Sequence, residues 1–128
     1  MKEIICAILS TLGTAFIYLL GGCDVALYCL ITAILLDYVS GLIKAYYTKT
    51  LSSKIGIKGI FKKIGILLLV MVSVIVDRVT GNTGAVRTLI IYYFVANEGL
   101  SIVENLAVTN IPIPNFLKKA LKNLKDNK

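Results

Sequence analysis

Four apolar stretches separated by short polar connections dominate the pattern of this 128-residue chain. They cover residues 4–22, 25–46, 60–79 and 85–108. A helix needs about 20 apolar residues to cross the roughly 30 Å hydrocarbon layer of a bilayer. Each stretch comes close to that length or exceeds it. The pattern therefore predicts an all-α membrane protein with four transmembrane helices.

The first stretch has a competing interpretation as a signal peptide, because Lys2 precedes it. The stretch is long for the apolar region of such a peptide. In addition, no clear A-x-A cleavage site occurs before the next apolar stretch begins. We therefore expect residues 4–22 to be retained as a membrane span.

The connection between the second and third stretches is basic and amphipathic. Lys54, Lys58 and Lys62 recur every four residues. Apolar side chains recur at helical spacing on the other face, at Ile57, Ile60, Phe61 and Ile64. This pattern predicts a helix that lies at the membrane surface before the third span begins. The uncharged part of that span is short, so Lys62 and Lys63 are expected to extend toward the lipid headgroups.

The carboxyl-terminal tail repeats this amphipathic pattern. Pro112 and Pro114 are expected to end the fourth helix, and apolar residues beyond them oppose a set of lysines. These membrane-surface lysines are Lys118, Lys119, Lys122 and Lys125. We expect two regions: a transmembrane helical domain at residues 1–111, and a basic, amphipathic cytoplasmic tail at residues 112–128.

The distribution of lysine predicts the orientation. Lysines occur at the amino terminus, between residues 44 and 63, and in the tail, whereas the connections around Asp24 and Gly81 have none. Cytoplasmic loops of membrane proteins collect Lys and Arg. Four crossings then place both termini in the cytoplasm. The alternative has three crossings and one segment on the membrane surface. It separates the two lysine blocks unless residues 4–22 are the segment that stays out.

Composition agrees with a membrane protein and excludes several other classes. Apolar residues make up 57% of the chain, more than the roughly 45–50% of soluble domains. The net charge of +7 comes from the loops, and no nucleic-acid-binding motif is present. The chain has no histidine, and its three cysteines lack CxxC spacing. We therefore expect no enzyme, metal site, cofactor or nucleic-acid partner.

Polar residues within the second and fourth stretches need an explanation, because a carboxylate at membrane depth costs about 2.5–3.5 kcal/mol. At helical spacing they form one stripe on each helix, in the cytoplasmic half. The first stripe is Asp37, Ser40, Gly41 and Lys44; the second is Glu98, Ser101 and Asn105, with Asn97 and Glu104 alongside. The stripes could pair the helices, with Asp37 or Glu98 neutralised by Lys44 or Lys63. Alternatively, they could line a water-filled opening between subunits.

The order of these features resembles the toxin-secretion/phage-lysis holin family over about residues 25–125. The residues that carry the resemblance are, in order, Asp37, Ser40, Gly41, Lys44 and Ala45; Ser53, Lys54, Gly56, Lys58, Gly59, Lys62 and Lys63; Asp77; Asn97, Glu98, Ser101, Ile102, Glu104 and Asn105; and Pro112, Pro114 and Leu117. The resemblance implies a homo-oligomer in the bacterial cytoplasmic membrane. It implies large, non-selective lesions that release an endolysin or a secreted toxin, with no need for direct contact with that cargo.

Two other functions remain open at this point. One is a small four-helix transporter with an intramembrane carboxylate. Proteins of that kind carry their key glutamate in the first span, where residues 4–22 have none. The other is a subunit of a larger membrane complex, in which a partner satisfies the polar stripes.

Overall fold

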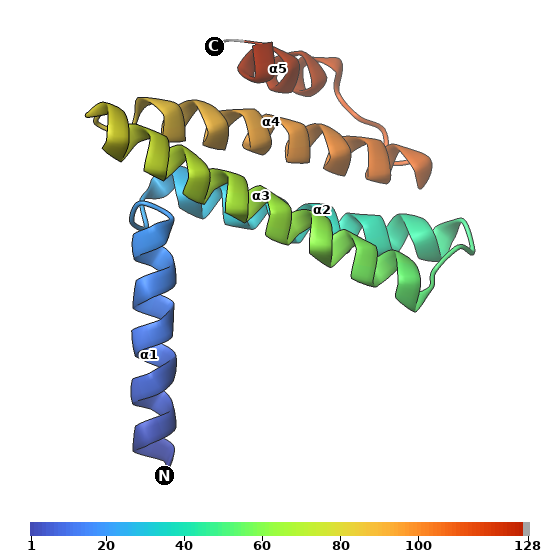
Figure 1. Cartoon of the computed structure of the whole chain (residues 1–128). Helices are drawn as coiled ribbons and strands as arrows, with labels where there is room; N and C mark the ends of the chain where they lie inside the picture. Colours follow the sequence, from blue (N-terminus) through green and yellow to red (C-terminus); the bar gives the residue numbers. More distant parts are fainter. Residues whose placement is uncertain (127–128) are drawn as a thin grey trace.

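The computed structural model describes residues 1–126, and within them it contains five helices and no strand (Figure 1). The helices are α1 (Lys2–Leu19), α2 (Val25–Tyr47), α3 (Ser53–Thr80), α4 (Ala85–Val108) and α5 (Asn115–Asp126). The first four are long and apolar enough to cross a membrane. This confirms the all-α prediction with four candidate spans. The last two residues of the predicted tail lie outside the described part.

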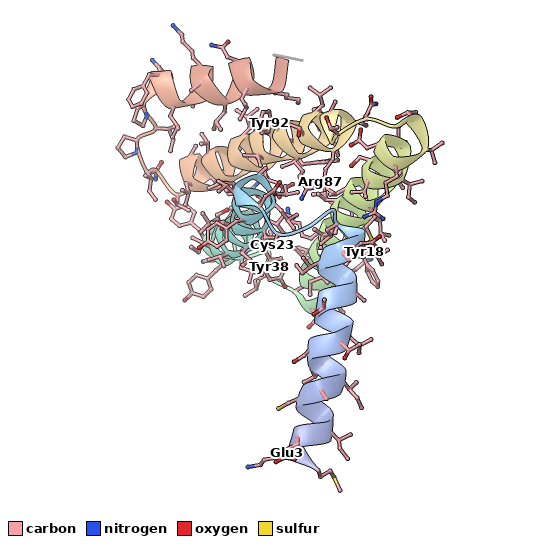
Figure 2. The ribbon with its side chains drawn as sticks, turned by 90° about the vertical axis from the view of Figure 1, so that its left-hand side faces the viewer. Glu3, Tyr18, Cys23, Tyr38, Arg87 and Tyr92 are labelled. Atoms are coloured by element: carbon pink, nitrogen blue, oxygen red, sulfur yellow. The ribbon has the colours of Figure 1, made fainter. Side chains whose placement is uncertain are left out.

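Helices α2, α3 and α4 form a bundle, whereas α1 projects away from it (Figure 1). No residue of α1 is buried, and its side chains point outward all around the helix (Figure 2). The small core lies between the other three helices. It is formed by Leu20, Leu27, Leu30, Ile34, Ile66, Val70 and Ile91. Most other large apolar side chains are exposed, which suits a protein whose solvent is lipid.

Helix α3 differs from the prediction because it is continuous. We expected a surface helix followed by a span at residues 60–79, but one helix runs from Ser53 to Thr80. At 1.5 Å per residue it is about 42 Å long, so it extends well beyond a hydrocarbon layer of about 30 Å. Its first turns pack closely on α2, since Tyr38 lies against Gly56 and Gly59. This contact supports a helical segment that two glycines would otherwise weaken.

The first span also ends earlier than predicted. Helix α1 stops at Leu19, because Gly21 and Gly22 adopt positive φ angles of 88° and 97°. Gly21 has a second reason to be glycine. A Cβ there would lie 2.6 Å from Nε of Arg87. The α1–α2 turn is therefore shaped by the arginine that packs against it.

Arg87 holds this turn onto α4 (Figure 2). Its Nε donates to the Leu20 carbonyl oxygen at 2.7 Å, and its Nη2 donates to the Gly22 carbonyl oxygen at 2.9 Å. Its Nη1 forms an ion pair with Oδ2 of Asp24 at 2.7 Å. The Arg87 side chain is 9% exposed. We call Arg87, Asp24 and the carbonyls of Leu20 and Gly22 the outer clamp, because they join the α1–α2 turn to the start of α4.

Asp77 completes the same end of the bundle in a way that the sequence did not show. Its carboxylate accepts hydrogen bonds from the backbone N–H groups of Val86 and Arg87, at 3.0 and 2.9 Å. Gly84 precedes α4 and has no side chain to cap it. A carboxylate from α3 therefore satisfies the first N–H groups of α4.

The stability of the outer clamp depends on pH through the carboxyl group of Asp24. Its hydrogen bond with Arg87 lowers the pKa of the Asp24 carboxyl below its usual value of 3.8, and the Leu27 N–H that it caps contributes to this. The carboxylate therefore stabilises the fold above its usual pKa. This contribution is lost as the pH falls through the lowered folded value. The side chain is 54% exposed, so solvent screening keeps the effect small.

We predict that Asp24→Asn reduces the loss of thermal stability on acidification between about pH 5 and pH 2. Unfolding midpoints measured in detergent across that range test it. Glu3→Gln is the matched control, because Glu3 is an exposed acid at the start of α1. An Asp24→Asn protein that loses stability as steeply as the native protein would show that the ion pair does not stabilise the clamp.

Candidate functional site

A network of polar side chains lies inside the bundle, where α2, α3 and α4 meet. Asp37 comes from α2, Lys63 from α3 and Glu98 from α4. The Lys63 ammonium donates hydrogen bonds to both carboxylates. Asp37 and Glu98 each lie next to the middle of their helices. One cation therefore joins three membrane helices within their apolar spans, where charge is costly.

Amide and hydroxyl groups extend this network toward the carboxyl-terminal ends of α2 and α4. Nδ2 of Asn105 donates to Oδ1 of Asp37 and to Oγ of Ser40, both at 3.0 Å. The Ser40 hydroxyl donates to the Asp37 carbonyl oxygen at 3.0 Å. In the part of the chain that the structure describes, no buried side-chain nitrogen or oxygen lacks a partner. The two predicted stripes thus face each other at Asp37, Ser40 and Asn105, whereas Glu98 is satisfied by Lys63.

We call Asp37, Ser40, Lys63, Glu98 and Asn105 the inner network. Its ionised groups are shielded from solvent, with side-chain exposures of 9% for Asp37, 12% for Lys63 and 2% for Glu98. Breaking a buried ion pair by removing one partner is costly, because the other charge stays buried without compensation. In this arrangement the network stabilises the packing of the three helices.

A cleft of about 150 Å³ adjoins the inner network between α2 and α3. Asp37, Lys63 and Asn105 border it together with Tyr38 and Lys62. The network is therefore not sealed inside an apolar core. A small separation of α2 from α3 would bring it into contact with water.

The other predicted site residues take different positions. Gly41 lies beside Asn105, and a Cβ on it would sit 3.7 Å from Nδ2 of that residue. Ser101 is half-buried, whereas Lys44 and Glu104 are exposed. Asn97 accepts a hydrogen bond from Lys125 of α5 at 3.5 Å. Lys44 is thus absent from the charge pairing that we considered for it.

The lysines expected at the membrane surface divide into two groups. Six are exposed: Lys54, Lys58, Lys62, Lys118, Lys119 and Lys122. Lys125 is half-buried against α4. Lys63 points inward to Asp37 and Glu98 rather than outward to the headgroups. The surface position expected of Lys63 was wrong, whereas the alternative that Lys63 neutralises Asp37 or Glu98 is confirmed, because its ammonium contacts both buried carboxylates.

Comparison with known proteins identifies the family. The model of the bacteriophage holin family matches residues 14–126. The chain belongs to the bacteriophage holin family. This confirms the resemblance seen in the sequence. The match covers all of the inner network and outer clamp, and most of α1 lies before it.

Several relatives of this holin-family chain are known. It is 46% identical over 119 residues to an uncharacterised 14.9 kDa protein encoded in the nagH 3′ region of Clostridium perfringens, which covers 92% of this chain and 90% of that protein. It is 33% identical over 87 residues to a probable holin of Bacillus phage phi105, which covers 68% of this chain and 64% of that protein. No solved structure gives a significant match.

We predict that Lys63→Met destabilises this holin-family protein by about 3–5 kcal/mol, because it leaves two carboxylates at membrane depth without a cation. Unfolding measured in a mild detergent tests this value. Lys62→Met is the matched control: the neighbouring lysine is exposed, so its removal should cost within about 0.5 kcal/mol. Equal stability of the two variants would mean that Lys63 does not hold the helices together.

Proposed function

We propose that this protein oligomerises in the bacterial cytoplasmic membrane and opens large, non-selective lesions. Through them a cell-wall hydrolase, or a secreted toxin, would leave the cytoplasm without binding to this chain. Membership in the holin family and the relative named as a probable holin support a holin-like role. The observation that carries the proposal further is the inner network, which combines charged groups from three helices.

The inner network suits a protein with a closed and an open state. If the helices separated within lipid, each exposed charge near the bilayer centre would cost about 2.5–3.5 kcal/mol. The same groups facing water would cost little. Separation therefore becomes favourable only when water fills the space between helices, as it does when several subunits open together. The helix-pairing and lumen-lining roles of the stripes would then belong to two states of one protein.

The orientation is part of the same proposal. The end of the bundle that carries Lys54, Lys58 and Lys62 faces the cytoplasm, and the outer clamp faces the opposite side. Cys23 lies in the turn of the outer clamp and is exposed. Cys6 and Cys29 lie within α1 and α2, where lipid would cover them.

We predict that the purified protein releases trapped dextrans from liposomes. A matched variant separates this activity from simple membrane damage. Asp37→Leu/Lys63→Met/Glu98→Leu replaces the three charges with apolar groups of similar size, a change that usually leaves folding intact. Since these groups cannot face water, dextran release should fall at least about tenfold, one order of magnitude or 1.4 kcal/mol. Release of protons or small cations alone by the native protein would instead favour the transporter.

We also predict that an impermeant thiol reagent added outside intact cells labels Cys23 before any lesion opens, and leaves Cys6 and Cys29 unlabelled. Mass spectrometry of the labelled protein locates the modified residue. A Cys23→Ser protein is the control and should take up no label. Labelling of Cys29 but not Cys23 would contradict the proposed threading.

A further inference from the structure

Helix α5 folds back along α4 instead of extending away from the bundle (Figure 1). Leu121 packs against Gly99 so closely that a Cβ on the glycine would lie 2.8 Å from Cδ2 of the leucine. Lys125 donates to Oδ1 of Asn97, and its ammonium lies 5.5 Å from the centre of the Tyr93 ring. These contacts define a specific interface between the apolar face of α5 and one side of α4.

The interface places α5 at the same level as the membrane-spanning part of α4. Near the far end of α5, Leu124 borders a hollow together with Thr88, Leu89 and Tyr92, which belong to the first third of α4. Lys125 contacts Asn97, which stands at the middle of α4. The helix therefore runs antiparallel to α4 and ends beside the half of α4 that is farthest from the cytoplasm.

Lipid cannot surround α5 in this position. Lys118, Lys119 and Lys122 are exposed. Because Leu121 lies beside Gly99, near the middle of α4, Lys122 is the one of these lysines nearest the bilayer centre, where a lysine costs about 2.5–3.5 kcal/mol. The end of α5 adds a second cost. The last four carbonyl groups of a helix have no partner within it, and unsatisfied backbone groups in hydrocarbon cost several kcal/mol each.

The outward faces of α2 and α3 have the opposite character. Exposed side chains on α2 include Leu35, Leu36 and Val39, and those on α3 include Leu68, Leu69 and Val72. These faces suit lipid. Apart from the end that carries Lys44, Lys54, Lys58 and Lys62, the bundle is thus apolar on its α2 and α3 sides, whereas its α5 side is basic.

We infer that α5 docked on α4 is part of the wall of the open lesion, with Lys118, Lys119 and Lys122 facing its water. This inference rests on the proposed lesion-forming function and says which side of each subunit lines the opening. When lipid surrounds a single subunit, the same costs displace α5 from α4 to the headgroups. Docking of α5 is therefore a feature of the assembled state.

A disulfide between α5 and α4 tests the inference. The variant carries Gly99→Cys and Leu121→Cys in a background with Cys6→Ala, Cys23→Ser and Cys29→Ala. A Cβ at position 99 lies 3.6 Å from Cγ of Leu121, so two cysteines can approach bonding distance. The second substitution also removes the leucine atoms that would collide with the first. We expect oxidised protein to release dextrans from liposomes within about twofold of the reduced protein, a difference under 0.5 kcal/mol.

Two results would overturn the inference. Oxidised protein that releases no dextran until a reductant is added would show that α5 must leave α4 for the lesion to open. Failure of the pair to oxidise in liposomes that do release dextran would show that α5 is not docked in the open state. If the reduced protein also failed to release dextran, the proposed lesion-forming function would be refuted. The inference, which rests on that function, would then be refuted as well.

The matched control is Gly99→Cys with Lys122→Cys in the same background. Lys122 is exposed, so this pair should remain unlinked under the same oxidation. A large label attached to a single Lys122→Cys should reduce dextran release, because it would occupy the lumen. The same label on Lys58→Cys, at the cytoplasmic end of α3, should leave release unchanged.

Discussion

The contact of Lys63 with both Asp37 and Glu98 is the interaction on which the bundle depends. Apolar side chains in lipid gain little by leaving lipid for one another, so the hydrophobic effect does not drive membrane helices together. Buried charges supply a reason for α2, α3 and α4 to stay in contact. Each of the three helices contributes one charged group. Lys63 is paired with both carboxylates only when all three helices are in contact.

The middle of the bundle and its outer end are held by different means. The inner network binds the helices by side chains that adjoin a cleft. The outer clamp uses backbone carbonyls of the α1–α2 turn, and Asp77 beside it binds the first N–H groups of α4. Arg87 and Asp77 fix the turns at this end through several contacts made together. Neither water nor lipid could replace all of these contacts at once. The inner network consists of groups that water could solvate one by one. In the proposed opening, the inner network would therefore separate before the outer clamp.

The sequence predicts the helices well and their partners poorly. Apolar length and lysine distribution suffice for four candidate spans, because both are local properties. Helical spacing also predicts the two polar stripes, but it leaves open whether they face each other or water. Lys63 shows the limit of such reasoning. Its neighbours in sequence predict a surface position, and the sequence left pairing with Asp37 or Glu98 open as an alternative. The structure shows contact with both carboxylates, 26 and 35 residues away. Arg87 gives no local signal for its contacts with the α1–α2 turn, which lies more than 60 residues earlier.

The position of α5, like that of Lys63, depends on a partner that its own sequence pattern does not specify. Its amphipathic pattern predicts an apolar surface as partner, but the pattern is the same whether that surface is a membrane or a helix. Gly99 is the residue that distinguishes them, since its missing side chain leaves room for Leu121 on α4. A tail that bound only lipid headgroups would need no such space on a membrane helix. The space at Gly99 therefore supports docking of the tail on α4 as a state of this protein. Water on that side of the bundle is the condition for this state.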